Sequence, residues 1–127
     1  MTMPTEPAAA AEHNGDAAPF SPCRSAGGFV FVSGQASVDN GVIVTGTFEQ
    51  EMRRSIENVR AVLARGGLSL GDVVKVNAYV QNSGDVPEFN RIYREYFTPP
   101  LPARTTIANC LGDRIKFEID VVAFGGA

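Results

Sequence analysis

The chain has 127 residues, of which 44% are hydrophobic and 20% are charged, as expected for one globular domain. Its formal net charge of −3 comes from three acids within residues 1–17, where no lysine or arginine occurs, and the rest of the chain balances eleven acids with eleven bases. A neutral body lacks the broad positive surface that binds phosphate backbones, which argues against nucleic acid as the main partner. No apolar run reaches the length of a membrane span, which argues against a membrane partner.

Residues 1–17 are rich in alanine, proline and glutamate and show no apolar periodicity. We therefore expect a mobile N-terminal tail followed by one domain over residues 18–127. The single histidine, His13, falls in this tail, so the sequence argues against a histidine-dependent catalytic triad. The tail also lacks the basic and long apolar regions of a signal peptide, and the cytoplasm is the expected location.

The two cysteines, Cys23 and Cys110, are widely separated and match no metal-ligand spacing. We interpret them as free thiols of an intracellular protein. Cys110 lies near a predicted turn, and without a histidine to activate it we expect a packed thiol rather than a nucleophile.

The first half of the domain predicts two strands and a helix. Phe29–Gln35 is a largely apolar strand, and Val42–Val44, which follows an Asn-Gly turn signal, is predicted to return beside it. Thr47–Arg65 predicts a helix that begins with a capping box. Its apolar residues recur at steps of three and four and form one stripe, made by Phe48, Met52, Ile56, Val59 and Leu63.

The second half predicts a strand, a helix and a hairpin. Val73–Val80 is the strand, and the helix starts at Asp85 and is ended by the proline-rich segment Thr98–Pro102. Two further strands, Leu101–Asn109 and Ile115–Asp120, are separated by a short turn and are predicted to form a terminal β-hairpin.

This order, β-β-α-β-α-β-β, predicts a two-layer α+β domain with a mixed sheet and two helices on one sheet face. The strands are apolar at consecutive positions, as in Phe29–Val32 and Val121–Phe124, so the other sheet face is partly apolar as well. Because no further part of the chain can cover that face, we expect a neighbouring subunit to do so.

Arg104 and Glu118 are the most chemically suggestive pair in the sequence. Arg104 follows a rigid proline segment on a strand without other charges, where its guanidinium could bind a carboxylate through two parallel hydrogen bonds. A surface or ion-pairing arginine is the alternative. Glu118 could move protons, or it could belong to an edge-strand ladder of salt bridges with Lys116 and Asp120.

Two further positions could belong to a site. Ser33 and Gly34 end a buried strand, where a glycine lets a ligand approach the backbone, although a simple bend explains the glycine equally well. Asn90 lies off the apolar stripe of the second helix, where solvent exposure is the alternative reading.

Short motifs follow one another in a characteristic order from about residue 18 to residue 124. They are Pro19-Phe20-Ser21, Phe31-Val32-Ser33-Gly34-Gln35, Asn58-Val59, Asp72-Val73-Val74-Lys75, Phe89-Asn90 with Tyr93 and Tyr96-Phe97, Pro102-Ala103-Arg104-Thr105-Thr106, and Glu118-Ile119. With these motifs the chain resembles the RidA/YjgF family of reactive-intermediate deaminases. The combination of the Pro-Ala-Arg segment, Ser-Gly-Gln and the late glutamate is fairly specific, whereas each piece alone is weak.

The resemblance implies a chorismate-mutase-like α+β fold, assembled as a homotrimer with active sites in the clefts between subunits. It also implies hydrolysis of 2-imino or 2-enamine acids, such as 2-iminobutanoate, to 2-keto acids and ammonia, with no metal or organic cofactor. Arg104 would bind the substrate carboxylate, and Glu118 would orient or activate the attacking water. The pocket would be lined by Phe20, Ser33, Gly34, Asn90 and Thr106.

Two positions depart from the usual family pattern. Phe20 stands where a tyrosine is usual, which removes a hydrogen-bonding hydroxyl, and Thr106 stands where cysteine is common. A pathway-specific deaminase of an aminomuconate-like or aminoacrylate-like acid is an alternative with the same fold. A small-molecule-binding protein without turnover is a second alternative, which Phe20 slightly favours. The ribonuclease label often attached to the family is disfavoured by the neutral body and by the lack of a structured histidine or an aromatic platform.

The relative placement of Arg104 and Glu118 depends on the turn of the predicted hairpin. A two-residue turn would put them on opposite sheet faces, whereas a three-residue loop or one bulge would put them on the same face. In a cleft between subunits the two side chains need not come from one chain, and we expect the trimer to complete the site.

Overall fold

The structure is a computed structural model that describes residues 18–126. The predicted mobile tail over residues 1–17, which includes His13, lies outside the described residues, as does residue 127. Among the residues that are described, no helix combines the length and the apolar character needed to cross a membrane.

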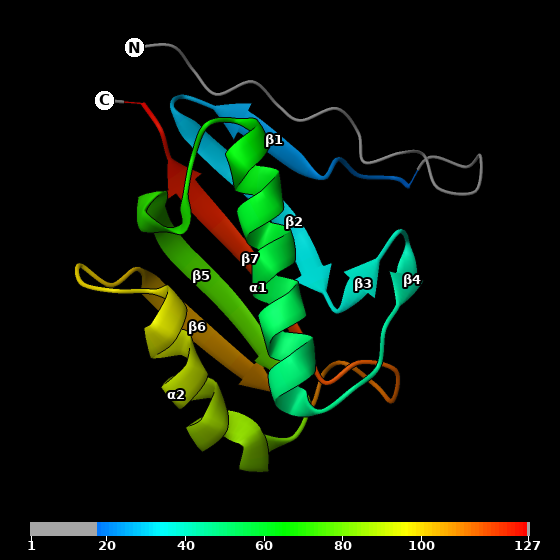
Figure 1. The fold of residues 1–127 in the computed structure, drawn as a ribbon. Helices are drawn as coiled ribbons and strands as arrows, with labels where there is room; N and C mark the ends of the chain where they lie inside the picture. Colours follow the sequence, from blue (N-terminus) through cyan, green and yellow to red (C-terminus); the bar gives the residue numbers. More distant parts are fainter. Residues whose placement is uncertain (1–17, 127) are drawn as a thin grey trace.

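A five-stranded mixed sheet with two helices on one of its faces forms the domain (Figure 1). In spatial order its strands are β1 (Cys23–Ala26), β2 (Phe29–Ala36), β7 (Phe117–Phe124), β5 (Val73–Val80) and β6 (Ala103–Ala108). Strands β5 and β6 run parallel, and the other neighbours in this sheet are antiparallel. The remaining elements are α1 (Phe48–Arg65), α2 (Val86–Tyr96), the 3₁₀ turns η2 (Leu70–Asp72) and η3 (Ser83–Asp85), and a separate pair of β3 (Val38–Asp39) and β4 (Val42–Ile43). The predicted α+β architecture is confirmed.

Helix α1 has the extent and the buried stripe that the sequence predicts. Its start is closed by reciprocal capping bonds: Gln50 N–H donates to Thr47 Oγ1 over 3.1 Å, and Thr47 N–H donates to Gln50 Oε1 over 3.0 Å. The stripe joins the helix to the sheet, and all of its members are buried: Phe48, Met52, Ile56, Val59 and Leu63. Burial of such side chains contributes roughly 1.5–3 kcal/mol each, so it is the main force that holds the two layers together.

The predicted hairpin of Leu101–Asn109 with Ile115–Asp120 is wrong, because strand β5 lies between the two strands. Arg104 of β6 lies beside Val76 of β5, and Val76 lies beside Val121 of β7 on the other side. Strand β5, helix α2 and strand β6 form a crossover connection, which returns the chain parallel to β5. Apolar runs separated by a turn signal are compatible with either pairing, since they do not specify the neighbour of a strand.

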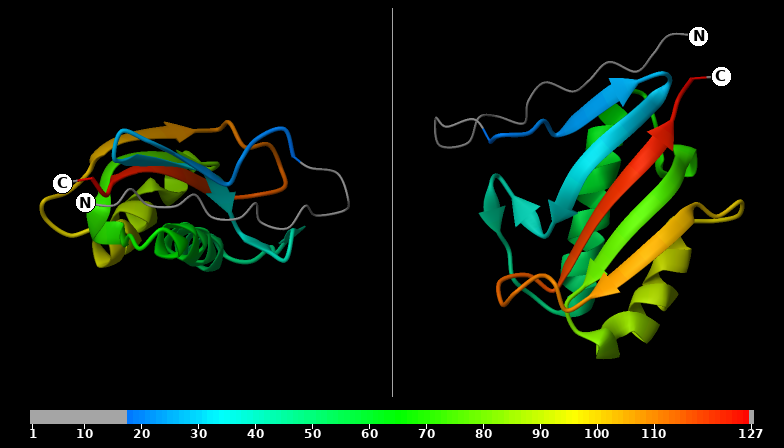
Figure 2. Two further views of the ribbon diagram at one scale, coloured as in Figure 1. Left: turned by 90° about the horizontal axis from the view of Figure 1, so that it is seen from above. Right: turned by 180° about the vertical axis from the view of Figure 1, so that it is seen from behind.

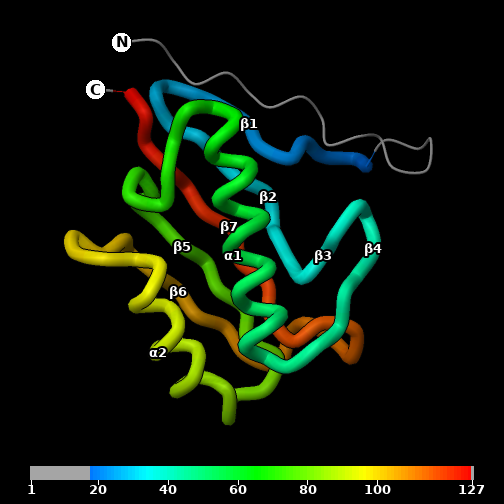
Figure 3. The backbone as a smooth tube through the Cα atoms, in the orientation of Figure 1, coloured from blue at the N-terminus to red at the C-terminus, as the bar shows by residue number. Residues whose placement is uncertain are grey.

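Strand β2 also has other partners than predicted. The segment Val42–Val44 does not return along it, because β4 pairs with β3 in a hairpin beside the main sheet (Figure 3). Strand β1 pairs with β2 instead, through a tight turn at Gly27 and Gly28, whose φ angles of 59° and 89° favour glycine. The sequence does not indicate β1, because Cys23–Ala26 shows no alternation of apolar and polar residues.

Among residues 18–126, no helix or strand packs on the sheet face opposite the helices (right-hand view of Figure 2). Large apolar side chains lie exposed on this open face, among them Phe29, Phe31, Ile107 and Phe124. The ring centroids of Phe29 and Phe124 are 4.8 Å apart, so these two side chains form a small aromatic cluster. The predicted uncovered apolar face is therefore present within one chain.

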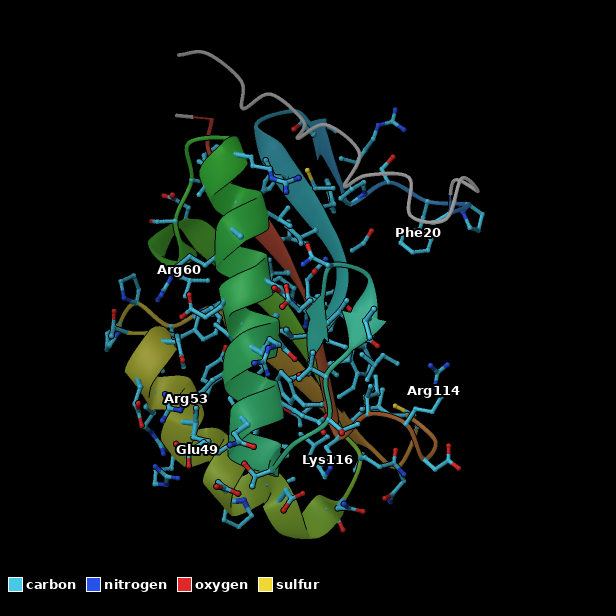
Figure 4. The ribbon with its side chains drawn as sticks, turned by 45° about the vertical axis from the view of Figure 1, so that its right-hand side comes forward. Phe20, Glu49, Arg53, Arg60, Arg114 and Lys116 are labelled. Carbon is cyan, nitrogen blue, oxygen red and sulfur yellow. The ribbon has the colours of Figure 1, made fainter. Side chains whose placement is uncertain are left out.

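A fully buried carboxylate fixes the connection between β6 and β7 to the start of α1. Glu51 Oε1 accepts a hydrogen bond from Lys116 N–H over 2.9 Å, and Glu51 Oε2 accepts one from Gly46 N–H over 3.1 Å. Lys116 Nζ forms an ion pair with Oε2 at 3.1 Å, and Figure 4 shows Lys116 beside the N-terminal end of α1. Because β7 begins at Phe117, these bonds set the entry of the chain into β7.

We expect Glu51→Ala to destabilise the fold by about 2–4 kcal/mol, because two backbone donors and one ammonium lose a buried partner. The change can be measured by urea unfolding at one fixed protein concentration. Glu57→Gln is the control, since Glu57 pairs with Arg60 on the exposed surface of α1, where such a pair contributes at most about 1 kcal/mol. Equal unfolding midpoints for the two variants would contradict the structural role of Glu51.

Candidate functional site

Arg104 lies on the face of β6 that points to α2, because its neighbour Val76 belongs to the buried core. Its Cζ atom is 4.7 Å from the ring centroid of Phe89 and 4.7 Å from that of Tyr93, both on α2. A guanidinium at this distance from aromatic rings is held by cation–π attraction. Within residues 18–126, Arg104 makes no hydrogen bond or ion pair with another side chain, so the ion-pairing alternative is wrong for the described part of the chain.

Tyr93 is buried beneath this arginine. Its hydroxyl has no hydrogen-bond partner among the described residues. Burial raises the pKa of Tyr93 to about 12, while the positive charge of Arg104 acts in the opposite direction. The two residues belong to a recess of about 260 Å³, which we name the arginine half-site and which is lined by Asn90, Tyr93, Arg94, Leu101, Pro102 and Arg104.

A second recess, of about 440 Å³, lies where the chain enters β1 and includes Phe20 and Ser33 in its lining. Ser33 Oγ donates a hydrogen bond to the carbonyl oxygen of Ser21, and Ser33 N–H donates one to the carbonyl oxygen of Pro22 over 2.9 Å. These bonds hold the segment before β1 against β2. Phe20 is 66% exposed and projects from the molecule (Figure 4).

Glu118 lies on the open face of the sheet, directly over Gly34, the residue that follows Ser33 in β2. A Cβ atom built on Gly34 would overlap Glu118 Oε2, so glycine is required for the carboxylate to lie there. The register between β2 and β7 shifts between Val32 and Gln35, which marks a bulge at this point. Burial raises the pKa of Glu118, and the nearby charge of Asp120 raises it further. We name Gly34 and Glu118 the carboxylate half-site, whereas Phe20 and Ser33 line the second recess, which includes neither of these two residues.

One chain does not bring Arg104 and Glu118 together. They lie on strands that flank β5, and they point to opposite faces of the sheet, because Arg104 shares its face with buried Val76, whereas Glu118 lies between the buried residues Phe117 and Ile119. Among the predicted site residues, Asn90 lies beside Arg104 in the arginine half-site, Gly34 lies beside Glu118, and Phe20 and Ser33 lie in the second recess. Thr106 is exposed on β6, two residues after Arg104, and it does not line the arginine half-site.

The predicted ladder of salt bridges among Lys116, Glu118 and Asp120 is wrong. Strand β7 is the central strand of the sheet, and Lys116 precedes it and binds Glu51. The carboxylate of Asp120 instead accepts hydrogen bonds from two side chains of β5, Asn77 and Tyr79.

Two groups of residues lie beside Arg104 and Glu118 that the sequence analysis does not predict as site residues. One is the pair Phe89 and Tyr93 under Arg104. Their spacing of four predicts a shared helix face, but only the placement of β6 below α2 brings Arg104 onto that face. The other group is Asn77, Tyr79 and Asp120 beside Glu118, which depends on the pairing of β5 with β7.

The fold, the recess around Arg104 and the Glu118 carboxylate over Gly34 define a small α+β protein with a cationic and an anionic half-site. Residues 11–124 match the family profile described as endoribonuclease L-PSP. A RutC family protein of Pyrococcus abyssi is 37% identical over 109 residues, which cover 84% of this chain and 86% of that protein. The 2-iminobutanoate/2-iminopropanoate deaminase of Dermatophagoides farinae is 36% identical over 91 residues, which cover 70% of this chain and 71% of that protein.

Solved structures show the same fold. RidA from the Antarctic bacterium Psychrobacter sp. PAMC 21119 aligns with a TM-score of 0.78 and 27% identity, covering 98% of each chain. Yeast Mmf1 aligns with a TM-score of 0.79 and 29% identity, covering 99% of this chain and 96% of its own. The chain belongs to the RidA/YjgF family, as its motifs predicted.

We expect Gly34→Ala to fold but to displace the carboxylate of Glu118, because the obstructing atom is the end of a flexible side chain. A crystal structure of the variant, compared with that of the wild type, measures the displacement. Gly84→Ala is the matched control, since a Cβ atom at Gly84 meets no atom within 4 Å. An unmoved Glu118 carboxylate in Gly34→Ala would contradict the contact.

Proposed function

We propose that this protein hydrolyses 2-imino and 2-enamine acids to 2-keto acids and ammonia, in sites formed between the subunits of a homotrimer. The observation that carries the proposal is the exposed Arg104 guanidinium, which is fixed on Phe89 and Tyr93 and has no carboxylate partner among residues 18–126. The similarity to the deaminase of Dermatophagoides farinae supports the same activity.

Arg104 binds the carboxylate of the substrate. Stacking on two aromatic rings holds the plane of the guanidinium, so its N–H groups remain available for two parallel bonds to a carboxylate. Asn90 and the exposed Leu101 border the same recess and would contact the rest of the substrate. A fixed carboxylate also fixes C2, the carbon that water attacks.

Glu118 acts as the acid and base of the reaction. Its raised pKa lets it exchange a proton closer to neutral pH than an ordinary glutamate. Water oxygen forms a bond to C2 of the imine while Glu118 accepts a proton from the water. Glu118 passes this proton to the nitrogen, which gives a carbinolamine with a hydroxyl and an amino group on C2. Glu118 then moves the hydroxyl proton to the amino nitrogen, and the C–N bond breaks as the C–O double bond forms, which leaves the 2-keto acid and ammonia. Ser33 and Phe20 would line this side of the pocket, and Thr106 would line the other.

The two half-sites are completed by different subunits. Arg104 and Glu118 point to opposite faces of one sheet, so one substrate can contact both side chains only across an interface. The open face, with its exposed Phe29, Phe31 and Phe124, supplies apolar surface for that interface.

We expect light scattering at micromolar concentration to give a particle of three chains, and a monomer would contradict the shared site.

Phe20 favours two other functions for the same pocket. A ring without a hydroxyl offers one hydrogen bond fewer than the tyrosine usual in the family, which fits an enzyme with a narrower substrate preference or a binding protein without turnover. Arg104 does not distinguish among carboxylate substrates, because aminomuconate-like, aminoacrylate-like and 2-imino acids all carry the group that it binds.

We expect Arg104→Ala to lower the rate of 2-keto acid release by on the order of a hundredfold or more, since a bidentate contact in the site is lost. The assay generates 2-iminobutanoate or 2-iminopropanoate in situ with a dehydratase or an amino-acid oxidase. Arg91→Ala is the control, because Arg91 makes only long ion pairs with acids on the exposed helix surface. Equal rates for wild type and Arg104→Ala would refute hydrolysis at this site, and a wild type without turnover would leave the binding reading.

Mixing two inactive variants tests the origin of the two half-sites. If Arg104 and Glu118 come from neighbouring subunits, refolding Arg104→Ala together with Glu118→Gln at equal amounts regenerates complete sites, roughly one in four for random trimers. We expect about a quarter of wild-type activity. Mixing Arg104→Ala with the double variant is the control and stays inactive. Mixed trimers that form but show no recovery would place both residues in one subunit's site.

A further inference from the structure

The open face of the sheet holds a second carboxylate that is fixed more firmly than Glu118. Asn77 Nδ2 donates a hydrogen bond to Asp120 Oδ1 over 2.9 Å, and Tyr79 Oη donates one to Asp120 Oδ2 over 2.8 Å. Both donors come from the neighbouring strand β5, and all three side chains are half-buried. Each oxygen of Asp120 thus has its own donor, so the carboxylate has a defined position and a stabilised negative charge.

Asp120 and Glu118 face the same side of β7, because they are two residues apart on one strand. The register places Asn77 opposite Asp120 and Tyr79 opposite Glu118. Tyr79 therefore spans the two acids: its backbone lies beside Glu118, and its hydroxyl binds Asp120.

We propose that Asp120, anchored by Asn77 and Tyr79, is a positioning residue whose fixed negative charge controls when Glu118 takes up and releases its proton. Asp120 itself transfers no proton in the reaction. Its role in turnover rests on the proposed function, whereas its effect on Glu118 does not.

The charged and titratable groups around Glu118 are consistent with this role. From β7 the neighbour is Asp120, and from β5 it is Tyr79, while β2 contributes the uncharged Gly34 and Ala36. The pKa of Tyr79 is raised to about 12, first by the hydrogen bond of its hydroxyl to Asp120 and then by burial, while the nearby Cys110 adds a smaller contribution in the same direction.

Lys75, the cation on the neighbouring strand β5, forms no ion pair with either acid in the described part of the chain. Lys75 Nζ on β5 donates to Thr105 Oγ1 over 2.9 Å. Within the described residues no ion pair offsets the charge of Asp120.

The direction of the effect follows from the sign of the charges. A negative charge beside a carboxyl favours its protonated form, and the pKa of Glu118 is raised by burial first and by Asp120 second. Removing the charge of Asp120 leaves the burial in place, so Glu118 should lose its proton at a lower pH without reaching the range of an exposed glutamate.

The test is a carbon-13 NMR titration of the full-length protein labelled at the glutamate carboxyl groups, with the Glu118 signal identified by its loss in Glu118→Gln. We expect the midpoint of Glu118 to move to lower pH by about half a unit or more in Asp120→Asn. Asp120→Ser, also neutral, should shift it in the same direction. Glu57→Gln removes one charge from the helix side of the sheet and should leave the midpoint unchanged.

The pH dependence of imine hydrolysis is measured independently of the NMR titration. In Asp120→Asn the acid limb of the rate of imine hydrolysis should shift to lower pH together with the NMR midpoint, which mere destabilisation of the fold would not produce. Unchanged Glu118 midpoints in both neutral variants overturn the proposal. A shifted midpoint in a protein without turnover supports the coupling of the two acids and overturns only the proposed function.

Discussion

The position of strand β5 between β6 and β7 decides how the candidate site residues of this protein are arranged. Because β5 pairs with β6 on one side and with β7 on the other, Arg104 and Glu118 cannot be neighbours across a hairpin. The pleat of the sheet then turns the two side chains to opposite faces. Each of them consequently has an environment of its own, and the candidate site residues are divided between the two faces of the sheet.

The two surfaces fix their charged groups by different means. Arg104 is held by aromatic rings, which orient the guanidinium without using its N–H groups. Gly34, which has no side chain, leaves the space that the Glu118 carboxylate occupies. The nearby Asp120 carboxylate is held by two hydrogen-bond donors from β5. In both cases the group keeps unused bonding capacity, which is the condition for binding or proton exchange with a ligand.

Much of the fold could be predicted because it depends on local pattern. The stripe of α1 and its capping box follow from spacing along one helix, and the apolar character of both sheet faces follows from the strand sequences. The hairpin at the end of the chain and the partner of β2 could not be predicted, because strand pairing depends on the crossover through α2 and on the turn at Gly27 and Gly28. Strand β1 carries too weak a pattern to be recognised.

The sequence by itself determined the family and the layer architecture, and it singled out Arg104 and Glu118 as candidate site residues, since these depend on residue types in a fixed order. The tertiary structure decided which groups surround them. The stacking of Arg104 on Phe89 and Tyr93, the contact of Glu118 with Gly34 and the network around Asp120 each join segments far apart in the chain. Such contacts depend on strand order and register, and a one-residue shift of register would turn each side chain to the other face.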